Sequence, residues 1–314
     1  MKLLVTSTAP FEFDPPEGVD VVYVDPGELV PPEHLDADAA VVEGGAAPAV
    51  TQLAREASRL RWVQTLAAGP DGVLKAGFGP DVQITNGRGF HDQTVSEVAL
   101  ALALAGVNRL PRLLELQKQH VFAHDEFGAW RALHPDDRVA TLIGANVLIW
   151  GFGSIGQTAA KLFAAASAHV RGVANSAGER AGFEVFTDES LPELLPETDV
   201  LVMVLPSTPE TDKALNAERI AQLKPISWVV NVGRGTTIDE DALDAALRSG
   251  RLGGAALDVT ATEPYPADGP LWDAPNCIIT PHVAGGRAVG AGEFICRNIE
   301  RLRRGEPLEN LVSR

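Results

Sequence analysis

Three ionisable side chains in the second half of the chain could act together on a carbonyl group. Arg234 stands in Asn-Val-Gly-Arg-Gly, Glu263 precedes a proline, and His282 follows Thr-Pro. A guanidinium grips a carboxylate as a planar fork and polarises a neighbouring carbonyl. An imidazole can pass a proton to the carbonyl oxygen, and a carboxylate beside it orients the ring and favours its protonated form. With a nicotinamide nearby, these groups could reduce a 2-oxo acid.

Each of the three residues also has a simpler interpretation. Arg234 could form a loop salt bridge, Glu263 could lie in a solvated turn, and His282 could cap a helix. Their positions favour a common site, because ligands of open α/β sheets bind beyond the carboxyl ends of the strands. Each residue follows a predicted strand, and these strands are Trp228–Val232, Ala255–Val259 and Ile278–Thr280.

A glycine turn supplies a candidate site for the nucleotide. The apolar run Val147–Trp150 predicts a strand, and Ser154–Ala168 predicts a helix. Between them lies a G-x-G-x-x-G turn of Gly151, Phe152, Gly153, Ser154, Ile155 and Gly156. A strand, a glycine turn and a helix in this order bind a pyrophosphate on the helix N-terminus. The alternative is a turn that binds nothing, but the flanking strand and helix favour a dinucleotide.

The residues after the next predicted strand, Val170–Ala174, bear on the choice between NAD(H) and NADP(H). An NAD enzyme carries a carboxylate there for the ribose 2′-hydroxyl. This chain has Asn175 and Ser176 instead, which can donate to a 2′-phosphate, and Arg180 could neutralise it. Glu179 is the counter-argument, since a shift of one turn would bring it toward the ribose. We expect NADP(H) to be favoured over NAD(H).

The composition indicates a soluble globular chain that is long enough for two domains. It has 314 residues, of which 45% are hydrophobic, and a formal net charge of −16. This acidity argues against nucleic acid and anionic membranes as partners. The longest apolar run, 98–107, is too short to span a membrane, and the N-terminus lacks a signal-peptide pattern. Two cysteines, Cys277 and Cys296, lack metal-ligand spacing, so we expect core packing, no metal site and a cytoplasmic protein.

The first part of the chain alternates short strands with helices, which predicts a small parallel α/β sheet. A crossover helix is expected over Pro48–Ser58. The expected strands are Leu3–Thr6, Val21–Val24, Ala39–Val42, Trp62–Thr65 and Val82–Thr85.

A capping box at Thr94–Glu97 predicts the start of a helix that runs to Val107, is apolar on nearly every side and is therefore buried. From Asn146 the alternation of strands and helices resumes as a second parallel sheet, and a last helix over Glu293–Arg304 should return to the first domain. We therefore expect a substrate-binding domain of residues 1–92 and 286–314, and a dinucleotide-binding domain of residues 93–285.

The sequence resembles the D-isomer-specific 2-hydroxyacid dehydrogenases over essentially its whole length. The resemblance is carried by a series of motifs in fixed order: 63–71, 94–97, 150–156, 205–211, 230–235, 256–259, 263–264 and 280–285. It implies an α/β protein with two doubly wound parallel sheets, one a Rossmann domain and the other a smaller flavodoxin-like domain.

The resemblance also implies roles for individual residues. Arg234, Glu263 and His282 would be the catalytic triad, and the backbone around Ala68 and Gly69 would bind the substrate carboxylate. Asp258 would hold the nicotinamide carboxamide. The remaining cofactor contacts would come from Pro206, Thr211, Val232, Gly233 and Thr94. Family members are usually homodimers, and the segment around Trp130 resembles the dimer-side loop of the family.

The sequence departs from the family pattern at Trp150, where a smaller aliphatic residue is commoner, and at Val98, where His usually follows the Glu of the helix.

Glyoxylate and hydroxypyruvate are the expected substrates. The chain ends without an appended regulatory domain, which argues against phosphoglycerate dehydrogenase, and Glu263 argues against formate dehydrogenase, which carries Gln there. The alternative is a non-catalytic nucleotide-sensing interaction protein of the corepressor type on the same fold.

Overall fold

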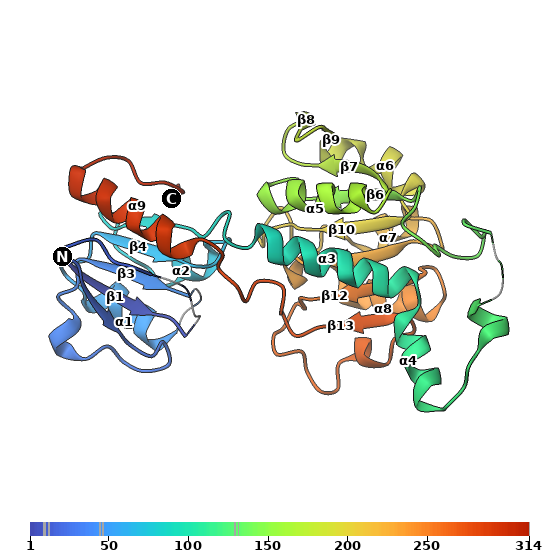
Figure 1. Ribbon diagram of the computed structural model, residues 1–314, viewed down its shortest axis with the longest axis horizontal. Helices are drawn as coiled ribbons and strands as arrows, with labels where there is room; N and C mark the ends of the chain where they lie inside the picture. The colour runs from blue at the N-terminus through green and yellow to red at the C-terminus, as the bar shows by residue number, and fades with distance from the viewer. Residues whose placement is uncertain are drawn as a thin grey trace. The chain divides into compact units, whose positions relative to one another are not determined.

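The computed structural model describes residues 1–8, 11, 13–43, 45, 47–128, 130 and 132–313. The chain divides into two compact units, each with its own sheet (Figure 1). Unit 1 comprises Met1–His91 and Gly285–Arg314, and unit 2 comprises Asp92–Ala284. Both boundaries lie one residue before the domain boundaries expected from the sequence.

Unit 1 is built on a sheet of five parallel strands in the order β2-β1-β3-β4-β5. The apolar runs make these strands because a parallel sheet buries both of its faces. The predicted strands are present with their ends shifted by at most one residue: β1 Lys2–Thr6, β2 Asp20–Tyr23, β3 Ala39–Val42, β4 Trp62–Thr65 and β5 Gln83–Thr85.

Helices cover both faces of this sheet. Helix α1 (Pro48–Glu56) packs its buried side chains with Leu4, while α9 (Ala291–Arg304) packs with Leu3 and Val5 from the opposite face. The predicted return of the last helix is therefore correct. Two short helices complete the unit, the 3-10 helix η1 (Pro32–His34) and α2 (Asp71–Lys75).

Unit 2 is built on an eight-stranded sheet in the order β13-β12-β11-β10-β6-β7-β9-β8. The strand order reverses between β6 and β10, which is the topological switch point where doubly wound sheets bind ligands. Its strands are β6 Asn146–Trp150, β7 His169–Val173, β8 Gly178–Arg180, β9 Phe183–Phe186, β10 Val200–Met203, β11 Trp228–Asn231, β12 Gly254–Leu257 and β13 Cys277–Ile279. The predicted doubly wound α/β class is confirmed.

One edge of this sheet differs from the expectation of purely parallel pairing. Residues 178–180 form β8, which pairs antiparallel with β9. No strand is predicted here from the sequence, because Gly178 and the charged Glu179 and Arg180 carry no strand pattern. A positive φ of 141° at Gly178 and one of 84° at Gly182 bring the chain into and out of this short edge strand.

The helices of unit 2 form two layers. On one face, α3 (Asp92–Val107) and α5 (Ser154–Ala165) enclose a core with Ile149 and Phe152. On the other face, buried residues of α6 (Leu191–Leu194), α7 (Ala217–Gln222) and α8 (Glu240–Arg248) pack with Leu148 and Trp150. Between α3 and β6 lie α4 (Leu110–Lys118) and a π-helix, η2 (His124–Gly128). The remaining 3-10 helices are η3 Asp188–Ser190, η4 Leu195–Glu197, η5 Gly235–Thr237 and η6 Pro270–Asp273.

Helix α3 corrects two expectations. It begins at Asp92, so Thr94 lies within its first turn and is not the N-cap; an acidic residue in the first turn already suits a helix N-terminus. The helix is also not buried all round, because Ala101 is exposed and Leu104 is 38% exposed. Among the described residues, no helix is long and apolar enough to cross a membrane.

Candidate active site

The glycine turn between β6 and α5 leaves room for a ligand at one of its three glycines. A Cβ on Gly151, which has a φ of +106°, would lie 2.5 Å from the Val204 carbonyl oxygen, and one on Gly156 would lie 2.3 Å from the Gly151 carbonyl oxygen. Chain packing therefore requires both of these glycines. A Cβ on Gly153 would meet nothing within 4 Å, so its absence keeps open space in front of the N-terminus of α5. That space fits the approach of a pyrophosphate.

Arg180 lies beside this turn. Its guanidinium donates to the Phe152 carbonyl oxygen at 3.3 Å and to the Ser176 hydroxyl at 2.6 Å. The side chain thus bridges the glycine turn and the exposed loop after β7 that contains Asn175. Because successive strand residues point to opposite faces, Glu179 points away from the side that Arg180 occupies. Of the two charged residues of β8, the one that lies beside the glycine turn is therefore the positive Arg180.

The first turns of α3 and α5 are joined by side-chain hydrogen bonds. The Ser154 hydroxyl donates to Asp92 at 3.1 Å, and the Ser96 hydroxyl donates to the Ile155 carbonyl at 3.2 Å. Thr94 lies in the same turn of α3, close in sequence to both contacts. The structure therefore brings the predicted residues 94 and 151–156 to one region of unit 2.

The loops after β10 and β11 are in contact. The Thr211 hydroxyl donates to the Pro206 carbonyl oxygen at 2.6 Å, which closes the first loop on itself. A Cβ on Gly233 would lie 2.6 Å from the Leu205 carbonyl oxygen, so the second loop packs directly on the first. Val232 is buried beneath them. These predicted cofactor-lining residues therefore lie together beyond the carboxyl ends of β10 and β11, next to the switch point.

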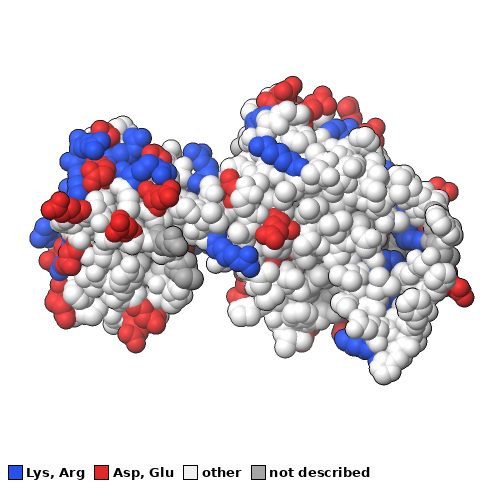
Figure 2. Space-filling model, in the orientation of Figure 1, with Lys and Arg blue, Asp and Glu red and all other residues white. Residues whose placement is uncertain are grey.

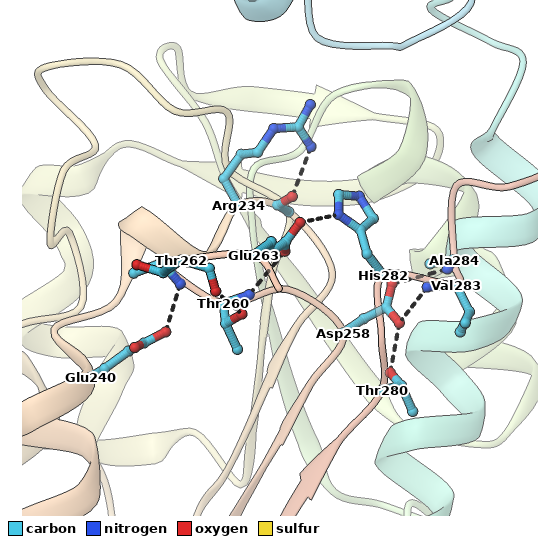
Figure 3. Close-up of polar contacts among 12 residues, drawn as sticks. Arg234, Glu240, Asp258, Thr260, Thr262, Glu263, Thr280, His282, Val283 and Ala284 are labelled. Carbon is cyan, nitrogen blue, oxygen red and sulfur yellow. Dashed lines mark hydrogen bonds and ion pairs between the residues drawn. The ribbon is translucent and has the colours of Figure 1, made fainter. Parts of the chain in front are cut away.

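The loop that carries Arg234 is held by two buried polar side chains. Asn231 donates to the Arg234 carbonyl oxygen at 3.0 Å and accepts from the Gly233 N–H at 3.0 Å. The Thr237 hydroxyl donates to the same Arg234 carbonyl at 2.6 Å. The guanidinium itself donates to the Gly233 carbonyl oxygen at 2.9 Å (Figure 3). The backbone under Arg234 is thus fixed, and the side chain extends beyond the strand end.

Glu263 and His282 form a direct pair on the neighbouring strand ends. His282 Nδ1 lies 2.8 Å from Glu263 Oε2, and the other carboxylate oxygen accepts the Thr260 N–H at 3.1 Å (Figure 3). Both side chains stay accessible, with 44% of His282 and 39% of Glu263 exposed. A neutral or protonated imidazole that donates from Nδ1 leaves Nε2 to exchange a proton with a ligand.

Asp258 holds the segment that carries His282. Its buried carboxylate accepts the Thr280 hydroxyl at 2.6 Å, the Val283 N–H at 3.0 Å and the Ala284 N–H at 3.0 Å, while its carbonyl oxygen accepts the His282 N–H at 2.8 Å. His282 itself has a φ of +51°, an uncommon conformation for a residue other than glycine. Three of about four acceptor sites of the carboxylate are therefore used within the chain.

Ala68 and Gly69 belong to unit 1, where they follow the carboxyl end of β4. Asn86 donates to the Ala68 carbonyl oxygen at 3.0 Å, and the Ala67 N–H donates to the Glu43 carbonyl oxygen at 3.1 Å. Within the part of the chain that the structure describes, no acceptor contacts the N–H groups of Ala68 and Gly69. Two such groups at the end of a parallel strand could bind an anion.

The sequence assigns no role to several residues that shape the site. Asn231 and Thr237 donate to the Arg234 carbonyl oxygen, the Thr260 N–H donates to the Glu263 carboxylate, and the Thr280 hydroxyl donates to the Asp258 carboxylate. Such bonds depend on loop conformation, which no periodicity predicts. Asn231 was within a quoted motif, but its role was not recognised.

The cysteines take no part in this site. Burial raises the pKa of the Cys277 thiol to about 12, which keeps it protonated and unreactive. Cys277 packs against the core, as expected, and both cysteines are free thiols. No cluster of three candidate metal ligands occurs among the residues whose positions are described.

A family model matches residues 100–284, and its description is "D-isomer specific 2-hydroxyacid dehydrogenase, NAD binding domain". The matched range covers most of unit 2, including the glycine turn and the three candidate catalytic residues.

Individual relatives extend the similarity to the whole chain. A glyoxylate reductase from Thermococcus onnurineus is 33% identical over 270 residues, which cover 82% of this chain and 78% of that protein. Glyoxylate/hydroxypyruvate reductase A from Escherichia fergusonii is 38% identical over 171 residues, or 54% of this chain and 55% of that protein. Among solved structures, an NADPH-dependent glyoxylate/hydroxypyruvate reductase from Sinorhizobium meliloti, in complex with NADP and sulfate, superposes with a TM-score of 0.82 at 29% identity. It covers 99% of this chain and 98% of that chain.

Proposed function

Because the chain belongs to the D-isomer specific 2-hydroxyacid dehydrogenases, a family of NAD(P)-dependent oxidoreductases, we propose that it reduces glyoxylate or hydroxypyruvate. The observation that carries the proposal is the Glu263–His282 pair at 2.8 Å, beyond β12 and β13, which follow the Arg234 strand β11 in the order of the sheet. The names of the reductases from Escherichia fergusonii and Sinorhizobium meliloti support this choice of substrate.

The catalytic residues have two separate roles, the stabilisation of negative charge and the transfer of a proton. Arg234 binds the substrate carboxylate with its guanidinium and polarises the adjacent carbonyl. The side chain is well placed for this because the backbone of its loop is held by Asn231 and Thr237. His282 donates a proton from Nε2 to the carbonyl oxygen as that oxygen gains charge. Glu263 accepts the Nδ1–H and thereby fixes the tautomer and the orientation of the ring. A reduced nicotinamide, when bound at the glycine turn, supplies the hydride.

Each unit has its own part in binding. Unit 2 holds the dinucleotide, with the pyrophosphate at Gly153 and the N-terminus of α5. The cofactor is further contacted by the loops containing Thr211 and Gly233 and by the remaining acceptor site of Asp258. Unit 1 binds substrate, with the N–H groups of Ala68 and Gly69 donating to its carboxylate.

NADPH is the preferred reductant in this proposal. Its 2′-phosphate is bound by Arg180 together with Asn175 and Ser176, where an NAD enzyme would present a carboxylate. The two contacts of Arg180 near the turn support this position for the phosphate. The preference for NADPH is also supported by the Sinorhizobium meliloti structure, which is in complex with NADP.

Replacing Arg180 by alanine tests the cofactor preference. We expect kcat/KM for NADPH to fall by about 10- to 100-fold, the loss that follows removal of a charge-assisted hydrogen bond, while kcat/KM for NADH changes little. Steady-state kinetics with both cofactors measure this. Glu179→Gln is the matched control and should leave the ratio of kcat/KM for NADPH to kcat/KM for NADH unchanged. A wild-type enzyme that prefers NADH would refute the assignment of Arg180 to the 2′-phosphate.

A homodimer completes the proposal. Two aromatic side chains between α4 and β6 lie at the surface, since Phe122 is 93% exposed and Trp130 is fully exposed. The surface over α3 and α4 is mostly uncharged in Figure 2, although the chain is strongly charged overall. Exposed apolar groups gathered in this way are typical of protein interfaces.

Light scattering tests the dimer. The wild-type mass should be twice the chain mass of 33.2 kDa, and Phe122→Glu should shift the mass toward that of the monomer, because a carboxylate cannot be buried unpaired. A Tyr23→Glu variant, at an exposed residue of unit 1, should remain dimeric. A monomeric wild-type protein would contradict this part of the proposal.

The experiment that tests the activity is a panel of 2-oxo acids followed through the absorbance of NADPH and NADH. We expect glyoxylate and hydroxypyruvate to be reduced with the highest kcat/KM. Turnover on larger 2-oxo acids only would refute the substrate assignment. No turnover on any member would instead favour the nucleotide-sensing alternative.

A further inference from the structure

The loop that carries Glu263 is held in place by residues that follow Arg234. The loop leaves β12 and includes Thr260, Ala261 and Thr262, with the Thr260 hydroxyl donating to the Thr262 carbonyl oxygen at 2.9 Å. Since Thr260 N–H donates to Glu263 Oε1, the direction of the Glu263 carboxylate depends on this loop. An anchor for the loop is therefore an anchor for the Glu263–His282 pair.

Glu240 provides one anchor. It is the first residue of α8, and its Oε1 accepts the Ala261 N–H at 2.7 Å (Figure 3). Capping of α8 is already supplied by Asp239, whose carboxylate accepts the Ala242 N–H at 3.3 Å. Burial raises the pKa of the Glu240 carboxyl, the Ala261 N–H opposes this, and Asp241 adds to it. A carboxylate that is partly buried against another loop, rather than solvated at its own helix end, points to a role in that loop.

Gly235 provides the second anchor. A Cβ at this position would lie 1.9 Å from the carbonyl carbon of Thr260 and 2.4 Å from the Ala261 nitrogen. The peptide between these two residues therefore packs flat against the glycine that directly follows Arg234. The segment from Gly235 to Glu240 thus contacts the Glu263 loop at both ends, and it links this loop to the loop of Arg234.

We propose that Glu240 is a positioning residue, which fixes the Glu263–His282 pair relative to Arg234 by accepting the Ala261 N–H. Without this acceptor, the Thr260–Thr262 loop loses one of its two contacts with the Arg234 segment, and the Glu263 carboxylate leaves its position against His282 Nδ1. The imidazole then loses the acceptor that fixes its ring orientation through Nδ1. The inference rests on the proposed function for its kinetic consequence, but not for its effect on the imidazole.

Three variants separate this role from a helix-stabilising one. Glu240→Ala removes the acceptor, whereas Glu240→Gln removes the charge but keeps an amide oxygen that can accept the Ala261 N–H. Glu218→Ala, at an exposed acid in the first turn of α7, is the matched control. If Glu240 only favoured the dipole of α8, Gln would be as harmful as Ala, because both lack the charge.

The activity-independent test is the NMR spectrum of the His282 ring, recorded at one pH in the protein without substrate and assigned with His282→Asn. We expect the ring signals to shift in Glu240→Ala, because the ring loses its contact with the Glu263 carboxylate, and to stay at the wild-type positions in Glu240→Gln and Glu218→Ala. Unchanged His282 signals in a folded Glu240→Ala protein would overturn the proposal. So would equal shifts in the Ala and Gln variants.

Kinetics provide the second readout. Glu240→Ala should lower kcat for the reduction by about 10- to 100-fold, the cost of a misplaced catalytic group, with a smaller change in KM because Arg234 still binds the carboxylate. Glu240→Gln should restore kcat and KM to the wild-type values. A wild-type protein that reduces no 2-oxo acid would refute the proposed function, while the NMR comparison would still decide the role of Glu240.

Discussion

Replacing His282 by asparagine should lower kcat for the reduction by about 10²- to 10⁴-fold, because the substituted amide cannot deliver a proton to the carbonyl oxygen. Asparagine keeps a polar side chain of similar reach, and it also tolerates the positive φ of 51° at this position. Binding of NADPH, measured by fluorescence, should be unchanged. The loss should therefore appear in kcat and not in cofactor affinity.

Two comparisons make this result specific. His169→Asn, at an exposed histidine of β7, should leave kcat at the wild-type value. Glu263→Gln should give an intermediate loss, since His282 stays in place but loses the carboxylate at 2.8 Å. Wild-type turnover by His282→Asn on every 2-oxo acid that the parent reduces would remove the imidazole from the mechanism.

Replacing Arg234 by alanine should lower kcat/KM by about 10²- to 10³-fold, as removal of a preorganised donor to developing charge does. Most of the loss should appear as a raised KM, because the guanidinium binds the substrate carboxylate in the ground state as well. Arg234→Lys should recover only part of the activity, since an ammonium cannot offer the planar fork. Kinetics on carbonyl substrates with and without an adjacent carboxylate would measure how much of the loss is in carboxylate binding and how much in polarisation of the carbonyl.

The control for this variant is another arginine of the same unit. Arg171→Ala breaks an ion pair with Glu197 at 2.8 Å, in the middle of β7 and not in a loop beyond its carboxyl end. It should leave kcat and KM unchanged. Equal effects of the two substitutions would mean that Arg234 acts through stability and not through the substrate.

The sequence predicted the sheets well because parallel strands are buried on both faces and appear as apolar runs. Val200–Met203 and Trp228–Asn231 are examples, since every residue in these strands is buried. Strand β8 was missed because it is an exposed edge, held by one antiparallel partner and entered through Gly178. Its position depends on tertiary pairing, which the local sequence does not express.

The candidate site was predictable in part for a related reason. Arg234, Glu263 and His282 follow strands that pair side by side, so their order along the chain gives their neighbourhood in space. The contact of Glu240 with Ala261 was not predictable, because it joins a helix start to a loop of irregular backbone. Asp258 was assigned to the cofactor from the family resemblance, and its three hydrogen bonds to the 280–284 segment became visible only in the structure.

The discontinuity of unit 1 has a consequence for the order in which the protein matures on the ribosome. One side of its sheet is covered by Phe294, Ile295 and Ile299 of α9, and Leu311 bridges to Thr85 at the edge strand. These residues are synthesised after the whole of unit 2. Unit 2 is contiguous and can form its core as soon as it has left the ribosome. In unit 1, by contrast, Leu3, Val5 and Trp62 stay uncovered on this side of the sheet until α9 has been synthesised.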